Sequence, residues 1–297
     1  MKILLLGKNG QVGWELQRSL APLGELVALD RQLADGLCGD LSNIDGLRAT
    51  LRAIRPDVVV NAAAYTAVDK AEAETELADL VNARAVGVLA QEVKALGGWL
   101  VHYSTDYVFD GHGSAPWRES DAVAPVNHYG ASKLAGERLI IESGCKHLIF
   151  RTSWVYGARG NNFAKTMLRL AKERESLSVI ADQIGAPTGA DLIADISALT
   201  LRQVFLRPEL SGLYHLAAAG EVSWHGYATH VIGFAKMHGE ALRVQGINAI
   251  ETSAYPTPAC RPMNSRLNTG KLRDSFSLHL PDWRSGVTRM LTEVLNK

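Results

Sequence analysis

The chain has 297 residues, of which 47% are hydrophobic and 21% charged, with 31 basic and 31 acidic side chains. This length suits one or two domains with a substantial core. The balanced charge argues against nucleic acid or an anionic membrane as a partner, and the apolar run at residues 3–6 is too short for a signal sequence or a membrane span, so we expect a cytoplasmic protein with small-molecule partners.

Short apolar runs alternate with helical patterns through the first half of the chain. The predicted strands are residues 3–6, 26–29, 58–60, 99–101 and 148–150. Between the first two, Val12, Leu16 and Leu20 recur at the spacing of one buried helix face. This alternation is typical of βαβ units and predicts an α/β fold, a Rossmann-type doubly wound parallel sheet.

The pattern changes after about Tyr156, where the alternation becomes irregular. Residues 255–267 are rich in Pro, Asn, Ser and Arg. We therefore expect a smaller, loop-rich substrate-binding domain made of about 156–187 and 218–297. The dinucleotide-binding domain is expected to comprise residues 1–155 and about 188–217.

A glycine loop follows the first predicted strand and opens the first helix. Glycines in this context permit a tight turn and a close backbone approach, and the helix N-terminus supplies N–H groups for a pyrophosphate. A ligand-free turn is the alternative, but the position between strand and helix favours dinucleotide binding. The expected contacts are Gly7, Gly10, Gln11, Val12 and Gly13.

Asp30 and Arg31 follow the second strand and bear on the choice of cofactor. Asp30 would accept hydrogen bonds from the adenosine ribose and favour NADH, whereas Arg31 could receive the 2′-phosphate of NADPH. We therefore expect both cofactors to be accepted. Asp40 either brackets the adenine or is a solvated turn residue. Further cofactor contacts are expected from Leu41, Ala64, Tyr65 and Thr66.

Tyr129 and Lys133 are four residues apart on a predicted helix, so their side chains share one face. Thr105 ends the strand that begins near Trp99, at the edge of the sheet where ligands bind. An exposed helix face is the alternative for the Tyr/Lys pair alone. Ser104 is the alternative to Thr105, because adjacent strand residues face opposite ways.

The glycine loop, the Ser/Thr at a strand end and Tyr-x-x-x-Lys, in this order, resemble the extended short-chain dehydrogenase/reductase family, whose register favours Thr105. Tyr129 would then be the catalytic acid. Lys133 would lower the pKa of Tyr129 and hold the nicotinamide ribose, and Thr105 would polarise the substrate carbonyl.

Four further segments sharpen this resemblance: residues 103–109, 151–156, 160–163 and 261–267. Together they look like the branch of the family that reduces dTDP-linked 4-keto-6-deoxy sugars. The resemblance covers essentially the whole chain. It implies hydride transfer from NADPH or NADH to C4 of dTDP-4-dehydro-L-rhamnose, which gives dTDP-L-rhamnose.

Substrate contacts are expected from Thr105 and from four other residues, three of which have an ordinary alternative. Trp154 could form an apolar wall for the sugar methyl group or be core, and Asn162 could contact substrate or cap a helix. Arg261 could pair with the diphosphate or be a solvated loop residue. The fourth is Asp106, next to Thr105.

The resemblance also implies Mg²⁺ near a dimer contact, and hence a homodimer. The corresponding carboxylates are Glu15, Asp191 and Glu293, and oxygen ligands suit a hard cation. Asp191 stands where the family pattern has Glu. Surface carboxylates that bind only solvent are the alternative.

Three other functions are less consistent with the sequence. A sugar-nucleotide 4,6-dehydratase commonly has Glu after the Thr-Asp pair, and a bifunctional epimerase-reductase such as GDP-fucose synthase has Cys two positions after its polarising Ser. Tyr107 fills both places here, which disfavours both. A non-catalytic NADP-binding regulatory subunit, like that of animal methionine adenosyltransferase, is disfavoured by the intact Thr105, Tyr129 and Lys133.

Overall fold

The computed structural model describes residues 1–296. Its centre is a six-stranded parallel sheet in the order β10-β5-β4-β3-β1-β2. The five predicted strands and the α/β class are confirmed. A sixth strand, β10, was not predicted as one, because its four residues carry no long apolar run. The strand bounds are Lys2–Leu6 (β1), Glu25–Leu29 (β2), Val58–Asn61 (β3), Trp99–Thr105 (β4), Lys146–Thr152 (β5) and Gly212–His215 (β10).

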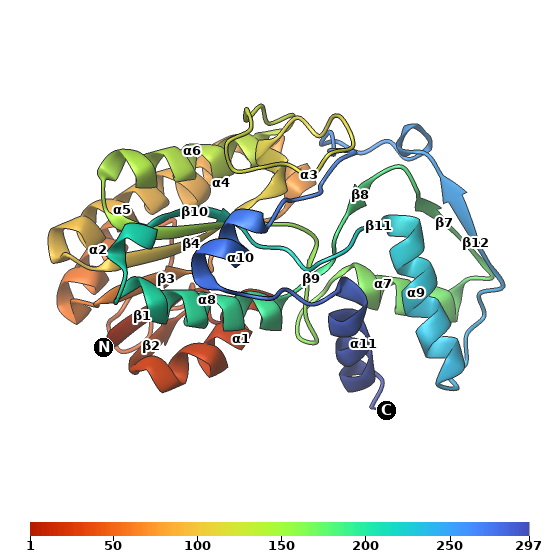
Figure 1. Cartoon of the computed structure of the whole chain (residues 1–297), viewed down its shortest axis with the longest axis horizontal. Coiled ribbons are helices and arrows are strands. Elements are labelled where there is room, and N and C mark those ends of the chain that lie inside the picture. The colour runs from red at the N-terminus through yellow and green to blue at the C-terminus, as the bar shows by residue number, and fades with distance from the viewer. Residues whose placement is uncertain (297) are drawn as a thin grey trace.

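Helices cover both faces of the sheet (Figure 1). On one face, α1 (Gln11–Leu20) and α8 (Ala190–Val204) bury Leu16 and Ile193 in one core cluster. On the other face, Leu51 and Leu89 share a second cluster. The helices of this second face are α2 (Ile44–Ile54), α5 (Ala85–Leu96) and α6 (His128–Ser143).

Between β3 and α5 the chain forms three short helical segments. These are α3 (Val68–Ala71), α4 (Thr75–Asp79) and the π-helical turn η2 (Leu80–Arg84). Single 3₁₀ turns occur at η1 (Ala21–Leu23), η3 (Asp106–Val108), η4 (Pro208–Leu210) and η5 (Thr252–Ala254).

A second lobe lies beside the carboxyl ends of the strands (Figure 1). Its core cluster includes Met167, Val231 and Trp283, contributed by three helices. The helices are α7 (Phe163–Glu173), α9 (Trp224–Met237) and α11 (Trp283–Val294). The strand pairs are β7 (Ser176–Ile180) with β12 (Gly246–Ile250), β8 (Ile184–Gly185) with β11 (Val222–Ser223), and β6 (Val155–Tyr156) with β9 (Thr188–Gly189).

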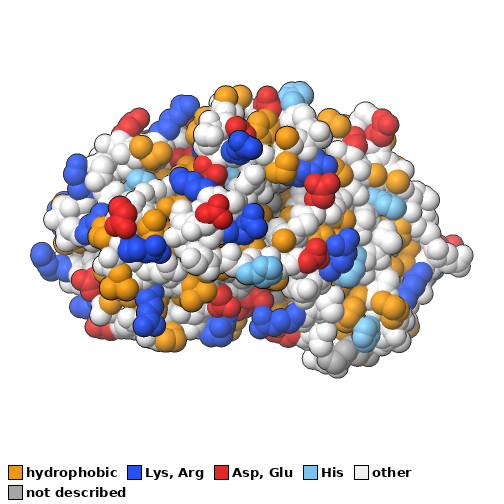
Figure 2. All heavy atoms as spheres, in the orientation of Figure 1, with side chains coloured by type: hydrophobic (Ala, Val, Ile, Leu, Met, Phe, Trp, Pro, Cys, Tyr) orange, Lys and Arg blue, Asp and Glu red, His pale blue; other side chains and the backbone are white. Residues whose placement is uncertain are grey.

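The helix α10 (Gly270–Phe276) lies between β12 and α11 in sequence. Its Leu272 and Phe276 belong to the core cluster of the sheet rather than to that of the second lobe. The division of the chain into two domains stays a prediction. Within residues 1–296, no helix combines the length and apolar character that a membrane crossing needs. Basic and acidic side chains are intermingled over the face drawn in Figure 2.

Candidate active site

The glycine loop lies where the strand order reverses, because β1 has β2 on one side and β3 on the other. Gly7 has φ +85°, and its N–H donates to the carbonyl of Leu29 at 2.9 Å. A Cβ on Gly13 would lie 2.0 Å from the carbonyl oxygen of Gly7, so only glycine lets α1 pack this closely. Gly10 caps α1 without a side-chain hydrogen bond. The loop therefore fits the pyrophosphate of a dinucleotide at the helix N-terminus.

The residues expected near the adenosine lie in the loops after β2. The carboxylate of Asp30 accepts hydrogen bonds from the Asn9 side chain and, at 2.8 Å, from the N–H of Gln32. Arg31 is exposed and has no ion pair with any residue that the structure describes. Asp40 closes a turn by accepting from the N–H of Ser42 at 2.9 Å, which is the turn alternative considered above. Leu41 is buried beside it.

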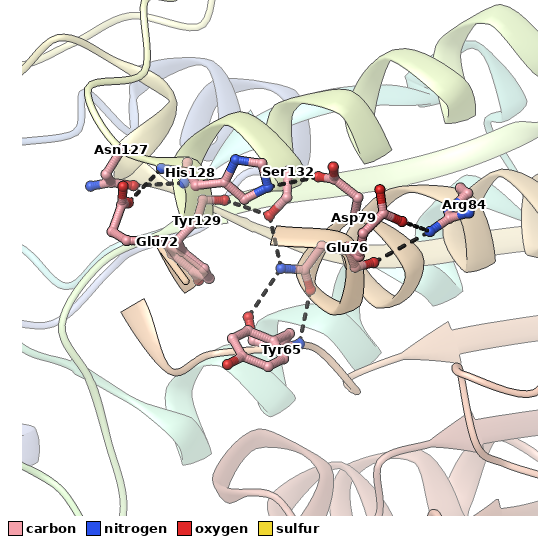
Figure 3. Close-up of polar contacts among 11 residues, drawn as sticks. Tyr65, Glu72, Glu76, Asp79, Arg84, Asn127, His128, Tyr129 and Ser132 are labelled. Carbon is pink, nitrogen blue, oxygen red and sulfur yellow. Dashed lines mark hydrogen bonds and ion pairs between the residues drawn. The ribbon is translucent and has the colours of Figure 1, made fainter. Parts of the chain in front are cut away.

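The loop after β3, which contains Ala64, Tyr65 and Thr66, is held by a buried side chain that sequence reasoning missed. Asn82 Oδ1 accepts from the N–H of Tyr65 at 2.8 Å. Asn82 Nδ2 donates to the carbonyl of Tyr65 and to Ser132 Oγ, each at 3.0 Å (Figure 3). The only indication of this role in the sequence was a single Asn within an otherwise apolar helical pattern.

Two side chains and one backbone contact fix the start of α6, which carries Tyr129 (Figure 3). Asn127 Oδ1 accepts from the N–H of Gly130 at 2.8 Å and caps the helix. Glu72 accepts from the N–H of His128, also at 2.8 Å. A Cβ on Gly130 would lie 2.1 Å from the carbonyl oxygen of Tyr107, so the helix packs directly on η3. This packing brings Tyr129 next to the end of β4.

The predicted catalytic residues Tyr129 and Thr105 lie close enough for the Thr105 side chain to lower the pKa of Tyr129, although the larger effect of burial outweighs it. Thr105 Oγ1 donates to Asp106 Oδ1 at 3.1 Å and accepts from the N–H of Tyr107 at 3.2 Å. Burial raises the pKa of Tyr129 to about 12, which keeps the phenol protonated at neutral pH, as a general acid requires. Ser104 Oγ, by contrast, has no hydrogen-bond partner within residues 1–296.

Asp106 is buried beside Thr105. Burial raises the pKa of its carboxyl group to about 7. Its Oδ2 lacks a hydrogen-bond partner in the described chain, so a protonated carboxyl or a substrate hydroxyl would satisfy this position.

Lys133 lies one helical turn after Tyr129 and is 2% exposed. Its Nζ donates to the carbonyl of Tyr103 at 2.5 Å and lies 3.3 Å from His102 Nε2. Burial lowers the pKa of Lys133 to about 8, against the opposing charge of Glu137. The lysine therefore titrates close to neutral pH.

Trp154 comes from the loop after β5 and has φ +50°, an uncommon conformation for a bulky residue. Its ring stacks on Trp224 with centroids 3.6 Å apart and planes 13° apart. A Cβ on Gly185 would lie 2.8 Å from the Trp154 ring. One face of Trp154 is thus covered by the second lobe, and Trp224 is a part of this wall that the sequence did not reveal.

Asn162 caps α7, because its Oδ1 accepts from the N–H of Lys165 at 3.1 Å. Its Nδ2 donates to the carbonyl of Gly157 at 2.7 Å and to Gln11 Oε1 at 3.1 Å. The amide therefore serves as the cap considered in the sequence, and it also ties the second lobe to the glycine loop.

Arg261 is ion-paired with Asp69, with Nη2 and Oδ2 2.6 Å apart, and its side chain is 24% exposed. The neighbouring Cys260 accepts a hydrogen bond on its carbonyl from Asn127 Nδ2 at 2.7 Å. The segment that carries Arg261 thus lies against the start of α6. Whether Arg261 binds a diphosphate stays a prediction.

The three carboxylates predicted for Mg²⁺ influence one another. Burial and the charges of Asp191 and Glu293 raise the pKa of Glu15. However, Asp191 Oδ2 is 2.8 Å from Arg289 Nη1, and residues 1–296 contain no group of three acidic, His or Cys side chains arranged to hold a metal. A guanidinium already neutralises Asp191 within the single chain. The magnesium site, which the family resemblance places near a dimer contact, stays a prediction.

Comparisons with known proteins identify the family of this chain. The RmlD substrate binding domain family matches residues 1–296. The chain is 58% identical to the dTDP-4-dehydrorhamnose reductase of Escherichia coli K12 over 294 residues, which covers 99% of this chain and 98% of that one. The chain belongs to the dTDP-4-dehydrorhamnose reductase family.

Other members of the dTDP-4-dehydrorhamnose reductase family match the whole chain. The protein from Burkholderia thailandensis is 51% identical over 303 residues and covers 100% of both chains. The crystal structure of the Bacillus anthracis reductase in complex with NADP has a TM-score of 0.87 at 36% identity, covering 98% of this chain and 99% of that one.

Proposed function

We propose that the protein is an oxidoreductase that reduces the C4 keto group of dTDP-4-dehydro-L-rhamnose with NADPH or NADH, giving dTDP-L-rhamnose. Family membership and the nucleotide-linked substrates of the related reductases support this assignment. The observation that carries it is the position of Thr105 at the end of β4 beside Tyr129, with Lys133 one turn after Tyr129 on α6.

Each of these groups has one role in the proposed reaction. When bound, the reduced nicotinamide supplies the hydride. Tyr129 donates its phenolic proton to the oxygen of the reacting carbonyl, and Thr105 donates a hydrogen bond to the same oxygen. Lys133 holds the nicotinamide ribose and stabilises the phenolate that Tyr129 becomes.

The remaining site residues would orient the two ligands. Gly7, Gly10, Gln11, Val12 and Gly13 would hold the pyrophosphate. The adenosine and the rest of the cofactor would lie along Asp30, Arg31, Asp40, Leu41, Ala64, Tyr65 and Thr66. Asp106, Trp154, Asn162 and Arg261 would line the substrate side. We also propose that the protein forms a homodimer and lies in the cytoplasm.

The test supplies dTDP-4-dehydrorhamnose and follows the loss of reduced-cofactor absorbance with NADPH and NADH in parallel. We expect turnover with both cofactors and dTDP-L-rhamnose as the product. Tight cofactor binding without turnover would instead favour the non-catalytic regulatory protein. Light scattering of the same preparation tests the homodimer.

A further inference from the structure

A chain of buried polar side chains runs under α6, from β3 through β4 to the catalytic lysine. Asn61 Nδ2 lies 3.2 Å from His102 Nδ1, and His102 Nε2 lies 3.3 Å from Lys133 Nζ. Asn61 and His102 are each 1% exposed. Buried polar groups of this kind are retained only when each finds a partner, so the hydrogen positions along the chain are constrained.

The orientation of Asn61 fixes the hydrogen on the His102 ring. Asn61 Oδ1 accepts from the N–H of Ala63 at 3.2 Å, which turns Nδ2 toward the ring. Since Nδ2 is a donor, Nδ1 of His102 must accept. Burial and the charge of Lys133 lower the pKa of His102 well below its ordinary value, so the ring is neutral and carries its one hydrogen on Nε2.

The Nε2–H group then points at the amine of Lys133. An ammonium group has only hydrogens to offer, whereas a neutral amine has a lone pair that accepts from Nε2–H. Of the other groups around Lys133, the carbonyl of Tyr103 accepts from either form. Glu137 favours the ammonium, but its two oxygens are engaged by Arg151 at 2.9 and 2.7 Å. Tyr129 is protonated. Among these contacts, the one with His102 favours the neutral amine, in the same direction as burial.

We propose that His102 is a positioning residue that holds the amine of Lys133 and, through its Nε2–H, favours the uncharged form. This inference rests on the proposed function. By favouring the amine, His102 sets the pH at which Lys133 loses its charge.

The first test examines the hydrogen on the ring and does not depend on turnover. Ring ¹⁵N spectra of the full-length protein, with His102 assigned by loss of its signals in His102→Gln, should show the Nε2–H tautomer without titration between pH 6 and about 9. In Asn61→Asp, the carboxylate would accept from the ring and the hydrogen should move to Nδ1. The Nδ1–H tautomer in the wild-type protein would overturn the proposal.

The second test uses the pH profile of kcat/KM. In the wild type, activity should fall as the pH rises through the pKa of Lys133, near 8, because the ammonium is the active form. His102→Leu should move this alkaline limb upward by about one pH unit, and His102→Gln, whose amide can present an N–H, should move it less. Ser197→Ala is the matched control, because it removes a buried 2.8 Å hydrogen bond to Tyr103 on the other face of the same strand.

The outcomes separate a positioning role from a structural one. The positioning role of His102 would be refuted if His102→Leu lowered kcat without shifting the alkaline limb of the kcat/KM profile. An equal shift of this limb in Ser197→Ala would refute it as well. If the wild-type protein fails to reduce the sugar, the proposed function is wrong, while the ring tautomer still decides the arrangement of His102.

Discussion

The two sides of the proposed site are built differently. Thr105 and Lys133 are buried and stand on β4 and α6. Both side chains are held by hydrogen bonds to residues at or just after the end of β4. Trp154 and Arg261 come from loops, are partly exposed, and each is held by one distant partner, Trp224 or Asp69. Regular secondary structure therefore holds the side chains on the sheet side, whereas those on the second-lobe side are held by a few contacts between segments remote in sequence.

This difference assigns the chemical step to the sheet and the selection of substrate to the second lobe. Interactions made only in the transition state change kcat, whereas those made equally with the substrate change KM. Substitutions on the two sides should thus differ in which kinetic constant they alter, as well as in the size of the effect.

The largest effect is expected from Tyr129→Phe, which removes the proton donor and leaves the ring in place. Turnover should fall by roughly 10²–10⁴-fold, the usual range for a lost general acid, while cofactor affinity is retained. Stopped-flow turnover and fluorescence titration with NADPH measure the two quantities. Near-normal turnover would show that the proton comes from another group and that Tyr129 on α6 is not the general acid.

Arg261→Ala should have an intermediate effect through substrate binding. A lost charge-assisted contact costs about 1.5–3 kcal/mol, which lowers kcat/KM by roughly ten- to more than a hundredfold. Cofactor affinity should hardly change. Arg243→Ala is the control, because Arg243 pairs with Glu175 on the exposed surface of the second lobe. Equal values of kcat/KM for the two variants would mean that Arg261 forms the ion pair with Asp69 but does not bind the substrate.

The smallest effect is expected from Trp224→Leu, which removes the ring stacked on Trp154. An aromatic pair contributes about 0.5–1.5 kcal/mol beyond its burial, so KM for the sugar should rise roughly two- to tenfold with kcat nearly constant. Initial-rate kinetics at saturating NADPH measure both constants. A fall in kcat larger than the rise in KM would contradict the division of labour between the two sides.

Sequence reasoning reached most of the sheet side because its signals are local. The glycine loop and the Tyr129–Lys133 spacing each lie within a few residues, and periodic apolar runs placed the strands that carry them. The roles of Asn82 and His102 were not predicted, since a polar residue inside an apolar pattern gives no indication of its partner. The Trp154–Trp224 stack and the Arg261–Asp69 pair could not be predicted, because tertiary packing alone joins positions 70 to about 190 residues apart.

The route of the chain through the two lobes has a consequence for synthesis on the ribosome. The second core combines residues from α7 with residues from α9 and α11, and the strand β10 and helix α8 of the sheet lie between them in sequence. Chains emerge N-terminus first. The segment with Thr105, Tyr129 and Lys133 is thus complete when half of the protein has been made, but the second core cannot be completed until α11 has left the exit tunnel. A nascent chain paused before α11 would carry its proton-transfer groups without the surface that selects their substrate.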